Sequence, residues 1–267
     1  MSECAIRRSG LGSVGLVAGT ILGLLLAIAP GARAGEATVA VAANFVEPLE
    51  TLQKMFGEET GHELVVVPGS TGKLYAQIVN GAPFDILLAA DQERPEKLAA
   101  EDQGEPESVF TYAIGRLTLW SPQPGVVAED GAKTLREGDF LHLAIANPEL
   151  APYGLAAQQT LQNLGLWDGL QDRIVRGENI AQTFQMVESG NAELGFVALS
   201  YVASERNRNP GSRWDVPGEL HEPIRQDAVL LQRGAKNEAA RAFLAFLKTP
   251  EAREVIERFG YAVDRVS

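Results

Sequence analysis

Cysteine is nearly missing from this chain: its 267 residues include one, Cys4, close to the N-terminus. Without that segment the protein would have no disulfide, no thiolate nucleophile and no cysteine-ligated metal. Histidine is scarce as well, and His62, His142 and His221 lie at no metal-ligand spacing from one another. We therefore expect no catalytic residues, no cofactor and no enzyme activity. Because sequence separation does not report distance, a secreted enzyme with a pair of carboxylates stays the alternative from another class.

A long uncharged run occurs only near the N-terminus, over residues 9–31. Arg7 and Arg8 precede it, and Ala32-Arg33-Ala34 follows it. A basic segment, an apolar segment and a small-x-small end are typical of a secretory signal peptide. The sequence predicts a signal peptide over residues 1–34, a mature start near Gly35 and a periplasmic protein. A retained membrane anchor is the alternative, but glycines within the run favour cleavage.

Positive charge is in deficit, with 23 Lys and Arg against 35 Asp and Glu and a formal net charge of −12. Removing Glu3, Arg7, Arg8 and Arg33 with the signal peptide takes away a net +2 and leaves −14. Such a surface argues against nucleic acid and anionic membranes as partners. An anionic ligand would have to be recognised by local, short-range contacts. Such contacts can act despite the overall negative charge, because salt screens the interaction between charges that are more than about 8 Å apart.

Strands and helices alternate along the remaining 230 or so residues, which predicts an α/β fold with parallel sheets covered by helices. One layout occurs four times: an apolar strand, a short turn and a helix. The turns are Ala43-Asn44, Ser70-Thr71-Gly72, Pro152-Tyr153-Gly154 and Asn179-Ile180. Each directs free backbone N–H groups beyond its strand, and the turns carry hydroxyls, amides and glycines rather than Arg or Lys. Together they predict a receptor for a small oxyanion.

The order of elements indicates two similar halves. Helices closing at glycine lead into apolar strands both at IVNGAPFDILLAAD and at MVESGNAELGFVALS. Two extended apolar stretches, 110–120 and 223–232, fit strands that pass between the halves as a hinge. We predict a first lobe of residues 35–118 and 225–267 and a second lobe of 119–224, with the ligand cleft between them. The Gly-, Pro- and Asn-rich stretch 207–217 predicts a surface loop.

Seven segments, in order, resemble the periplasmic molybdate-binding proteins of ABC transporters over essentially the whole mature chain. They are VAANF, GSTGKLYAQIVNGAPFDILLAADQ, FTYAIGRLTLW, AIANPELAPYG, GENIAQ, ELGFVALS and PIRQDAVLL. The resemblance implies a two-lobed periplasmic binding protein of the type II-like class, which closes on molybdate or tungstate and delivers it to a membrane permease. It implies molybdenum only as molybdate, and we expect a monomer that binds no nucleic acid.

The same resemblance implies the ligand-binding residues Asn44, Ser70, Thr71, Tyr153 and Ile180. Ser70 and Thr71 would supply hydroxyls, while Tyr153 and Ile180 would supply backbone N–H groups, with the Tyr153 phenol as a further candidate donor. Some family members add a tyrosine hydroxyl at the position of Ala198, which this chain lacks.

Each of these residues also has a structural interpretation. Asn44 and Asn179 are ordinary helix N-cap types, and Glu47 and Pro48 fit the first turn of a helix that Asn44 would cap. Ile180 alone reads as a buried aliphatic residue.

The chemistry of a fully deprotonated dianion fits these donors, because such an anion offers only acceptors. Phosphate keeps a proton at neutral pH and needs an acceptor in its site. The four turns place no carboxylate at a donor position, although Glu178 stands next to Asn179. Sulfate also lacks a proton, so a receptor for sulfate stays an alternative that only the resemblance disfavours.

Overall fold

The computed structural model describes residues 34–264, which form one compact unit. The predicted signal peptide and Cys4 lie outside the described residues, apart from Ala34. No helix within 34–264 has both the length and the apolar character needed to cross a membrane.

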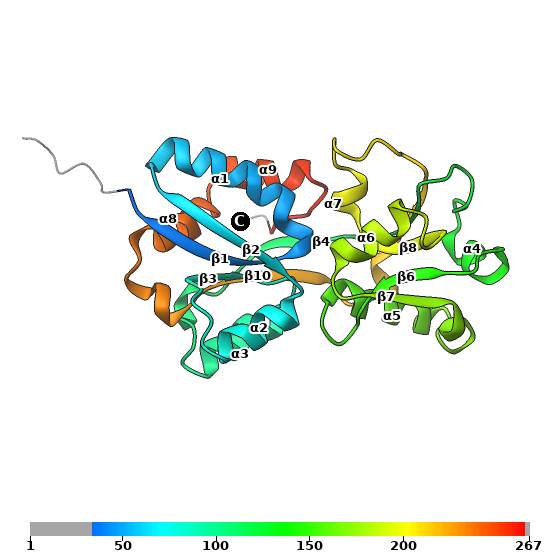
Figure 1. Ribbon diagram of the computed structural model, residues 1–267, viewed down its shortest axis with the longest axis horizontal. Helices are drawn as coiled ribbons and strands as arrows, with labels where there is room; N and C mark the ends of the chain where they lie inside the picture. Colours follow the sequence, from blue (N-terminus) through cyan, green and yellow to red (C-terminus); the bar gives the residue numbers. More distant parts are fainter. Residues whose placement is uncertain (1–33, 265–267) are drawn as a thin grey trace, which may run out of the picture. The chain divides into compact units, whose positions relative to one another are not determined.

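The first sheet contains five strands in the order β2-β1-β3-β10-β4 (Figure 1). Its strands are β1 (Glu36–Ala42), β2 (Glu63–Gly69), β3 (Ile86–Leu88), β4 (Phe110–Gly115) and β10 (Ile224–Leu230). Strands β2 and β3 run parallel to β1, whereas β10 runs antiparallel to both β3 and β4. Its helices are α1 (Val46–Thr60), α2 (Thr71–Val79), α3 (Glu93–Ala100), α8 (Glu238–Phe246) and α9 (Pro250–Arg258).

The second sheet repeats this arrangement in the order β7-β6-β8-β5-β9. Its strands are β5 (Leu117–Ser121), β6 (Leu143–Ala146), β7 (Ile174–Gly177), β8 (Leu194–Ala198) and β9 (Ser212–Asp215). Its helices are α4 (Gly131–Glu137), α5 (Pro152–Asn163), α6 (Ile180–Glu188) and α7 (Leu199–Val202). Short 3-10 helices complete the chain: η1 (Ala43–Phe45), η2 (Pro106–Ser108), η3 (Asp168–Arg173), η4 (Gly218–Leu220) and η5 (Gln232–Lys236).

Each sheet with its helices is a lobe, and the two-lobed α/β prediction is confirmed. The expected parallel arrangement holds for the core of each sheet, while β10 and β5 run antiparallel to their neighbours. The predicted loop 207–217 contains the edge strand β9, which pairs with β5. A four-residue strand that alternates half-buried and exposed side chains is weakly marked in sequence.

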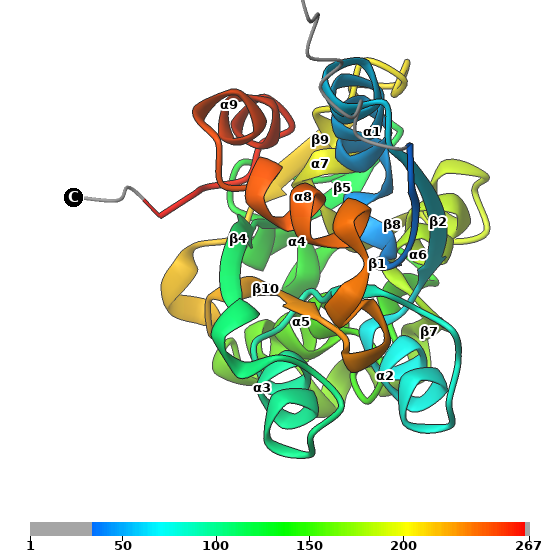
Figure 2. The same cartoon turned by 90° about the vertical axis from the view of Figure 1, so that its left-hand side faces the viewer.

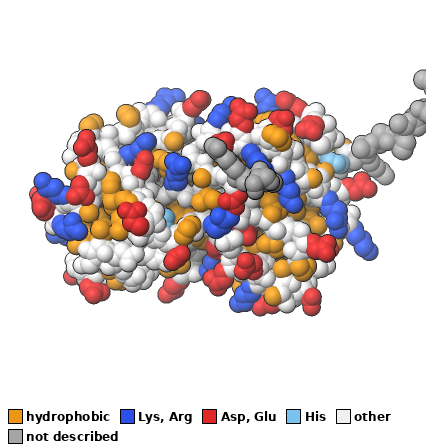
Figure 3. All heavy atoms as spheres, turned by 180° about the vertical axis from the view of Figure 1, so that it is seen from behind, with side chains coloured by type: hydrophobic (Ala, Val, Ile, Leu, Met, Phe, Trp, Pro, Cys, Tyr) orange, Lys and Arg blue, Asp and Glu red, His pale blue; other side chains and the backbone are white. Residues whose placement is uncertain are grey.

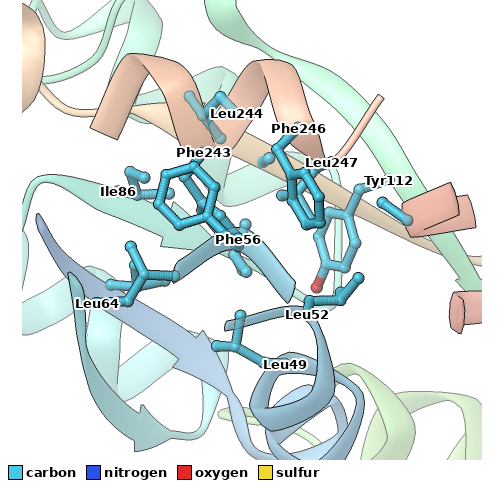
Figure 4. Close-up of a cluster of buried hydrophobic side chains, with 14 of the residues drawn as sticks. Leu49, Leu52, Phe56, Leu64, Ile86, Tyr112, Phe243, Leu244, Phe246 and Leu247 are labelled. Atoms are coloured by element: carbon cyan, nitrogen blue, oxygen red, sulfur yellow. The ribbon is translucent and has the colours of Figure 1, made fainter. Parts of the chain in front are cut away.

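Helices cover both faces of the first sheet (Figure 2). Helices α1, α8 and α9 pack on one face around Phe56, Phe243 and Phe246, whose rings contact one another (Figure 4). Helices α2 and α3 pack on the other face through Leu74, Ile78 and Leu98. The central parallel strand β3 is apolar and fully buried, as a strand covered on both faces must be, whereas the edge strand β2 is partly exposed.

The chain passes from the first sheet to the second at Arg116, between β4 and β5, and returns between β9 and β10. The lobe boundaries at residues 118 and 225 stay predictions. The strands that lie at them are β5, which begins at Leu117, and β10, which begins at Ile224. Both passages lie beside the contact between the lobes, so residues at the ends of β4 and β10 can influence it.

Candidate functional site

A small cavity lies where the carboxyl ends of strands from both lobes meet. Three α-helix N-termini, those of α2, α5 and α6, and the η1 turn border it. It is lined by Ala42, Ala43, Asn44, Gly69, Ser70, Thr71, Ala90, Ala151, Pro152, Tyr153, Asn179 and Ile180. All five sequence-predicted site residues are among them. The volume of about 10 Å³ is close to the least that holds one water molecule, so the walls lie in close contact.

Ser70 is the most telling residue of the site. It follows β2 in an extended conformation and directly precedes α2, the position at which a serine usually caps a helix. Its side chain makes no cap hydrogen bond here. It is 3% exposed, and among the residues that the structure describes its Oγ is the one buried side-chain polar atom without a hydrogen-bond partner. A buried hydroxyl without a partner is costly, and a ligand in the cavity would satisfy it.

Thr71 is the first residue of α2 and is also buried. Its Oγ1 accepts a hydrogen bond from the Ala90 N–H at 3.0 Å. Because the hydroxyl accepts there, its own proton is available for donation in another direction. Ala90 follows β3 and also lines the cavity, so this bond ties the ends of two strands together.

Asn44 lines the cavity, but its predicted role as a helix cap is wrong. The residue lies inside η1, and α1 begins after Phe45 without a side-chain cap. Instead, the Asn44 Nδ2 donates to Gln226 Oε1 at 2.9 Å and to Tyr261 Oη at 3.0 Å. Both amide protons are thus used inside the protein, so only the main chain of Asn44 is left to face a ligand. The short 3-10 turn, which local pattern did not reveal, moves the helix start by one residue, from Phe45 to Val46.

Tyr153 is the second residue of α5, after Pro152. The first N–H groups of a helix have no acceptor within it, so the Tyr153 N–H is directed out of the helix toward the cavity end. Its phenol, which the sequence left as a candidate donor, accepts a hydrogen bond from Gln226 Nε2 at 3.2 Å. Burial raises the pKa of the Tyr153 phenol well above its usual value, so the hydroxyl stays protonated.

Ile180 is the first residue of α6, and its side chain is buried in the apolar core of the second lobe. Asn179 caps this helix, as its residue type predicts, by accepting from the Gln182 N–H at 3.0 Å. The cap leaves the Ile180 N–H among the free donors of the first turn. The apolar side chain therefore does not disqualify Ile180 from a polar site.

Two second-lobe hydroxyls hold the η1 turn in place. Tyr201 Oη donates to the Ala43 carbonyl at 2.7 Å, and Ser200 Oγ donates to the Asn44 carbonyl at 3.3 Å. Ala198, whose position lacks the hydroxyl seen in some resembling proteins, is fully buried just before them. The nearby hydroxyls thus bind the main chain of the opposite lobe.

Charged side chains are kept away from the cavity wall. Of the lining residues, none carries a carboxylate, ammonium, guanidinium or imidazole group. Within residues 34–264, no three His, Cys, Asp or Glu side chains gather to form a metal site. Over the face seen in Figure 3, acidic and basic side chains are interspersed. Any binding of an anion here therefore relies on neutral donors.

Direct contacts between the lobes surround the cavity. The Gly72 N–H donates to the Leu150 carbonyl at 2.9 Å, so main chain meets main chain. Lys73 Nζ pairs with Glu178 Oε2 at 2.6 Å, and Arg206 pairs with Glu50 at 2.6 Å. A groove of about 550 Å³ adjoins the cavity and shares Ala43, Gly69 and Asn179 with it.

Three buried residues behind the cavity were not predicted: Gln226, Tyr112 and Tyr261. Gln226 bonds the side chains of Asn44 and Tyr153, Tyr261 bonds the side chain of Asn44, and Tyr112 bonds Gln226. A polar residue such as Gln226 within the apolar strand PIRQDAVLL was the available indication, because buried amides need partners.

Comparison with known proteins places the chain in a family. A family model described as bacterial extracellular solute-binding protein matches residues 37–262. The molybdate-binding protein ModA of Azotobacter vinelandii is 50% identical over 236 residues, covering 88% of this chain and 93% of that protein. ModA of Rhodobacter capsulatus is 46% identical over 245 residues, covering 92% and 95%.

The solved structure of the Azotobacter vinelandii periplasmic molybdate-binding protein has a TM-score of 0.83 and 43% identity to this chain. It covers 86% of this chain and 100% of its own. The resemblance predicted from the seven segments is thereby confirmed, and the chain belongs to the bacterial extracellular solute-binding protein family.

Proposed function

We propose that this protein binds molybdate in the cavity between its lobes and delivers it to the membrane permease of an ABC transporter. Tungstate, with the same charge and shape, would bind by the same contacts. The relatives named above support molybdate as the ligand, and the family supports extracytoplasmic binding. We further propose that the mature protein is periplasmic, acts as a monomer and has no enzyme activity.

One observation carries the proposal: neutral donors converge on a cavity that holds an unpartnered buried hydroxyl. The Ser70 and Thr71 hydroxyls and the N–H groups of the first turns of α2, α5 and α6 suit a guest that only accepts hydrogen bonds. Hydrogen bonds to a charged group contribute about 1.5–3 kcal/mol each. Five to seven of them, less the cost of closing the lobes, suffice for the roughly 12 kcal/mol of a nanomolar complex.

The lining also supports selectivity and the absence of catalysis. A protonated phosphate would place an O–H against donors, with no carboxylate on the wall to accept it. The hydroxyls of Ser70 and Thr71 have no histidine, carboxylate or lysine on the cavity wall to act as a general base.

Calorimetric titration of the mature chain with molybdate, tungstate, sulfate and phosphate tests the proposal. We expect tight binding of molybdate and tungstate and much weaker binding of phosphate. Ser70→Ala should weaken molybdate binding by about 1.5–3 kcal/mol without lowering the melting temperature of the anion-free protein, because it removes a hydroxyl that has no protein partner.

Ser189→Ala is the matched control, since Ser189 lies exposed at the end of α6 and its Oγ bonds only neighbouring residues, the carbonyls of its own helix turn and Asn191 Nδ2. If the parent bound sulfate alone, the assignment of molybdate would be wrong and the receptor class would stand. If Ser70→Ala and Ser189→Ala bound molybdate equally well, Ser70 would not belong to the site.

A further inference from the structure

Behind the anion cavity lies a buried group of polar side chains that the binding proposal does not use. We call Asn44, Tyr112, Tyr153, Gln226 and Tyr261 the interlobe amide cluster. Each is at most 4% exposed. Tyr153 belongs to the second lobe, and the other four belong to the first. Polar groups this deeply buried persist only where their hydrogen bonds are satisfied.

Gln226 is the centre of the cluster. Its Oε1 accepts from Asn44 Nδ2 at 2.9 Å and from Tyr112 Oη at 3.1 Å, and its Nε2 donates to Tyr153 Oη at 3.2 Å. One amide therefore joins Asn44 of the first lobe to Tyr153 of the second. These are two of the residues whose main chain borders the cavity.

Tyr261 completes the connection on the side of Asn44. It accepts from Asn44 Nδ2 at 3.0 Å and donates to the Asn44 carbonyl at 2.7 Å, so the side chain and main chain of Asn44 are both fixed. Burial raises the pKa of Tyr261 to about 12 and that of Tyr112 well above its usual range, so both phenols keep their protons.

An irregularity in the first sheet brings Tyr112 to Gln226. The pairing of β10 with β4 shifts register between Gln226 and Asp227, which face Ala113 and Thr111 and leave Tyr112 without a partner strand residue. Such bulges redirect side chains beside functional sites. The Tyr112 ring packs in the hydrophobic core of the first lobe, and its hydroxyl oxygen lies at the edge of that hydrophobic core (Figure 4). The Tyr112 hydroxyl lies 2.9 Å from the Ala89 carbonyl oxygen and 3.1 Å from Gln226 Oε1, so its one proton is shared between these two acceptors.

Gly115, at the end of β4, keeps space for the bond between the lobes. A Cβ at this residue would overlap the Tyr153 hydroxyl and lie 2.7 Å from Gln226 Nε2. Its φ is not in the left-handed region, so the glycine is needed for room rather than for its backbone freedom. This is a second, independent sign that the chain is built around the contact between Gln226 and Tyr153.

We propose that Gln226 is a positioning residue that aligns the donors of the two lobes and stabilises their closed arrangement around the anion. The proposal rests on the proposed function, since it names the residue that holds that site together. When the lobes separate, the hydrogen bond between Gln226 Nε2 and Tyr153 Oη breaks. The bonds of Gln226 to Asn44 and Tyr112 are within the first lobe and remain. Gln226 thus acts on the anion only through the residues it holds.

The test measures the molybdate Kd, the dissociation rate and the anion-free melting temperature of Gln226→Met, Tyr153→Phe and Gly115→Ala. We expect Gln226→Met to raise Kd by about 10- to 100-fold, mainly through faster dissociation. Tyr153→Phe and Gly115→Ala should raise it by about 3- to 30-fold, because each removes or displaces only the hydrogen bond between Gln226 and Tyr153. The double variant Gln226→Met/Tyr153→Phe should be less than additive.

Gln53→Met is the matched control, because Gln53 is a partly buried amide that bonds the Leu64 carbonyl at 2.7 Å within the first lobe. It should lower the melting temperature and leave Kd within about twofold of the parent. Small-angle scattering should show the lobes of Gln226→Met further apart than those of the parent at saturating molybdate.

Unchanged Kd and dissociation rate in Gln226→Met and Gly115→Ala, with the parent binding molybdate tightly, would overturn the inference and leave the proposed function standing. A purely structural role would lower melting temperature in step with Gln53→Met and leave the dissociation rate unmoved, which also overturns it. A parent that bound none of the four anions would overturn the proposed function, and the inference with it.

Discussion

The two lobes have the same strand order but furnish the cavity in different ways. The first lobe presents side-chain hydroxyls, Ser70 and Thr71, at the start of α2. The second lobe presents main chain: the side chain of Ile180 is buried in its core, and the phenol of Tyr153 is bound to Gln226. A repeated scaffold has thus been used once with polar side chains and once without them.

Residue type is therefore a poor guide to whether a residue belongs to a binding site when its donor is a backbone N–H group. An isoleucine can serve an oxyanion site because its N–H, at the first turn of a helix, has no acceptor within the helix. The same feature means that ordinary alanine substitution leaves the second-lobe donors intact. The comparison is best tested with substitutions that act on main chain in one lobe and on side chains in the other.

The largest effect should come from Ile180→Pro. Proline is favoured at the first position of a helix, and Asn179 has φ −149° and ψ 172°, an extended conformation close to that favoured before proline. The substitution removes the N–H while α6 keeps its start. We expect molybdate binding to weaken by about 1.5–3 kcal/mol, measured by calorimetry, because one donor to a charged acceptor is lost.

Ile180→Ala is the control for that experiment. It loses the buried side chain, as proline largely does, but retains the N–H. Both variants should show a lower melting temperature, and only the proline variant should show the loss of affinity. Equal affinity in the two would mean that the second lobe does not donate through Ile180.

In the first lobe, Thr71→Ala should affect binding and stability together. Removing the hydroxyl deletes a donor to the anion and also leaves the Ala90 N–H without the acceptor that it has at 3.0 Å. We expect affinity to fall by about 1–3 kcal/mol and the free energy of unfolding by a further 1–2 kcal/mol or so, by calorimetry and urea denaturation.

Thr71→Ser should restore most of both losses, because it keeps the hydroxyl. The contrast with Ser70→Ala, which should lower affinity alone, distinguishes the two neighbouring hydroxyls. Failure of the serine variant to recover affinity would contradict the assignment of the Thr71 hydroxyl as a donor.

The smallest effect should come from the exposed ion pair between the lobes. Lys73→Gln removes the pair with Glu178, and exposed pairs contribute about 0–1 kcal/mol. We expect at most about a fivefold increase in Kd at low salt, vanishing at about 0.5 M salt because the charges are then screened. Lys54→Gln, which breaks an exposed pair with Glu58 inside α1, is the matched control and should leave Kd unchanged.

Local pattern predicted much of the fold, because each strand, turn and helix is encoded by neighbouring residues. The apolar strands, Asn179 as a cap and Gly61 at the end of α1 with φ 74° all follow from short-range rules. The antiparallel strands β5 and β10 could not be predicted in the same way. Their direction depends on how the chain crosses between the lobes, which no stretch of neighbouring residues specifies.

The part of the site that consists of turns and helix N-termini was predicted from the sequence. All five predicted residues line one cavity, and their roles in binding stay a proposal. The cap assigned to Asn44 failed because its side chain found partners 182 and 217 residues away, in Gln226 and Tyr261. Contacts over such separations depend on the assembled lobes, so the strand could indicate that Gln226 needs partners but not which residues they are.

The main-chain contact between Gly72 and Leu150 sets a limit to how tightly this receptor can shut. A Cβ at residue 72 would lie 3.1 Å from the Leu150 Cα and carbonyl oxygen, so a single methyl group would already require Leu150 to shift by a few tenths of an ångström. Progressively larger residues at position 72 would hold the two lobes at progressively larger separations. Such a series would show whether the affinity for the anion and its dissociation rate change together or independently as the lobes are held further apart.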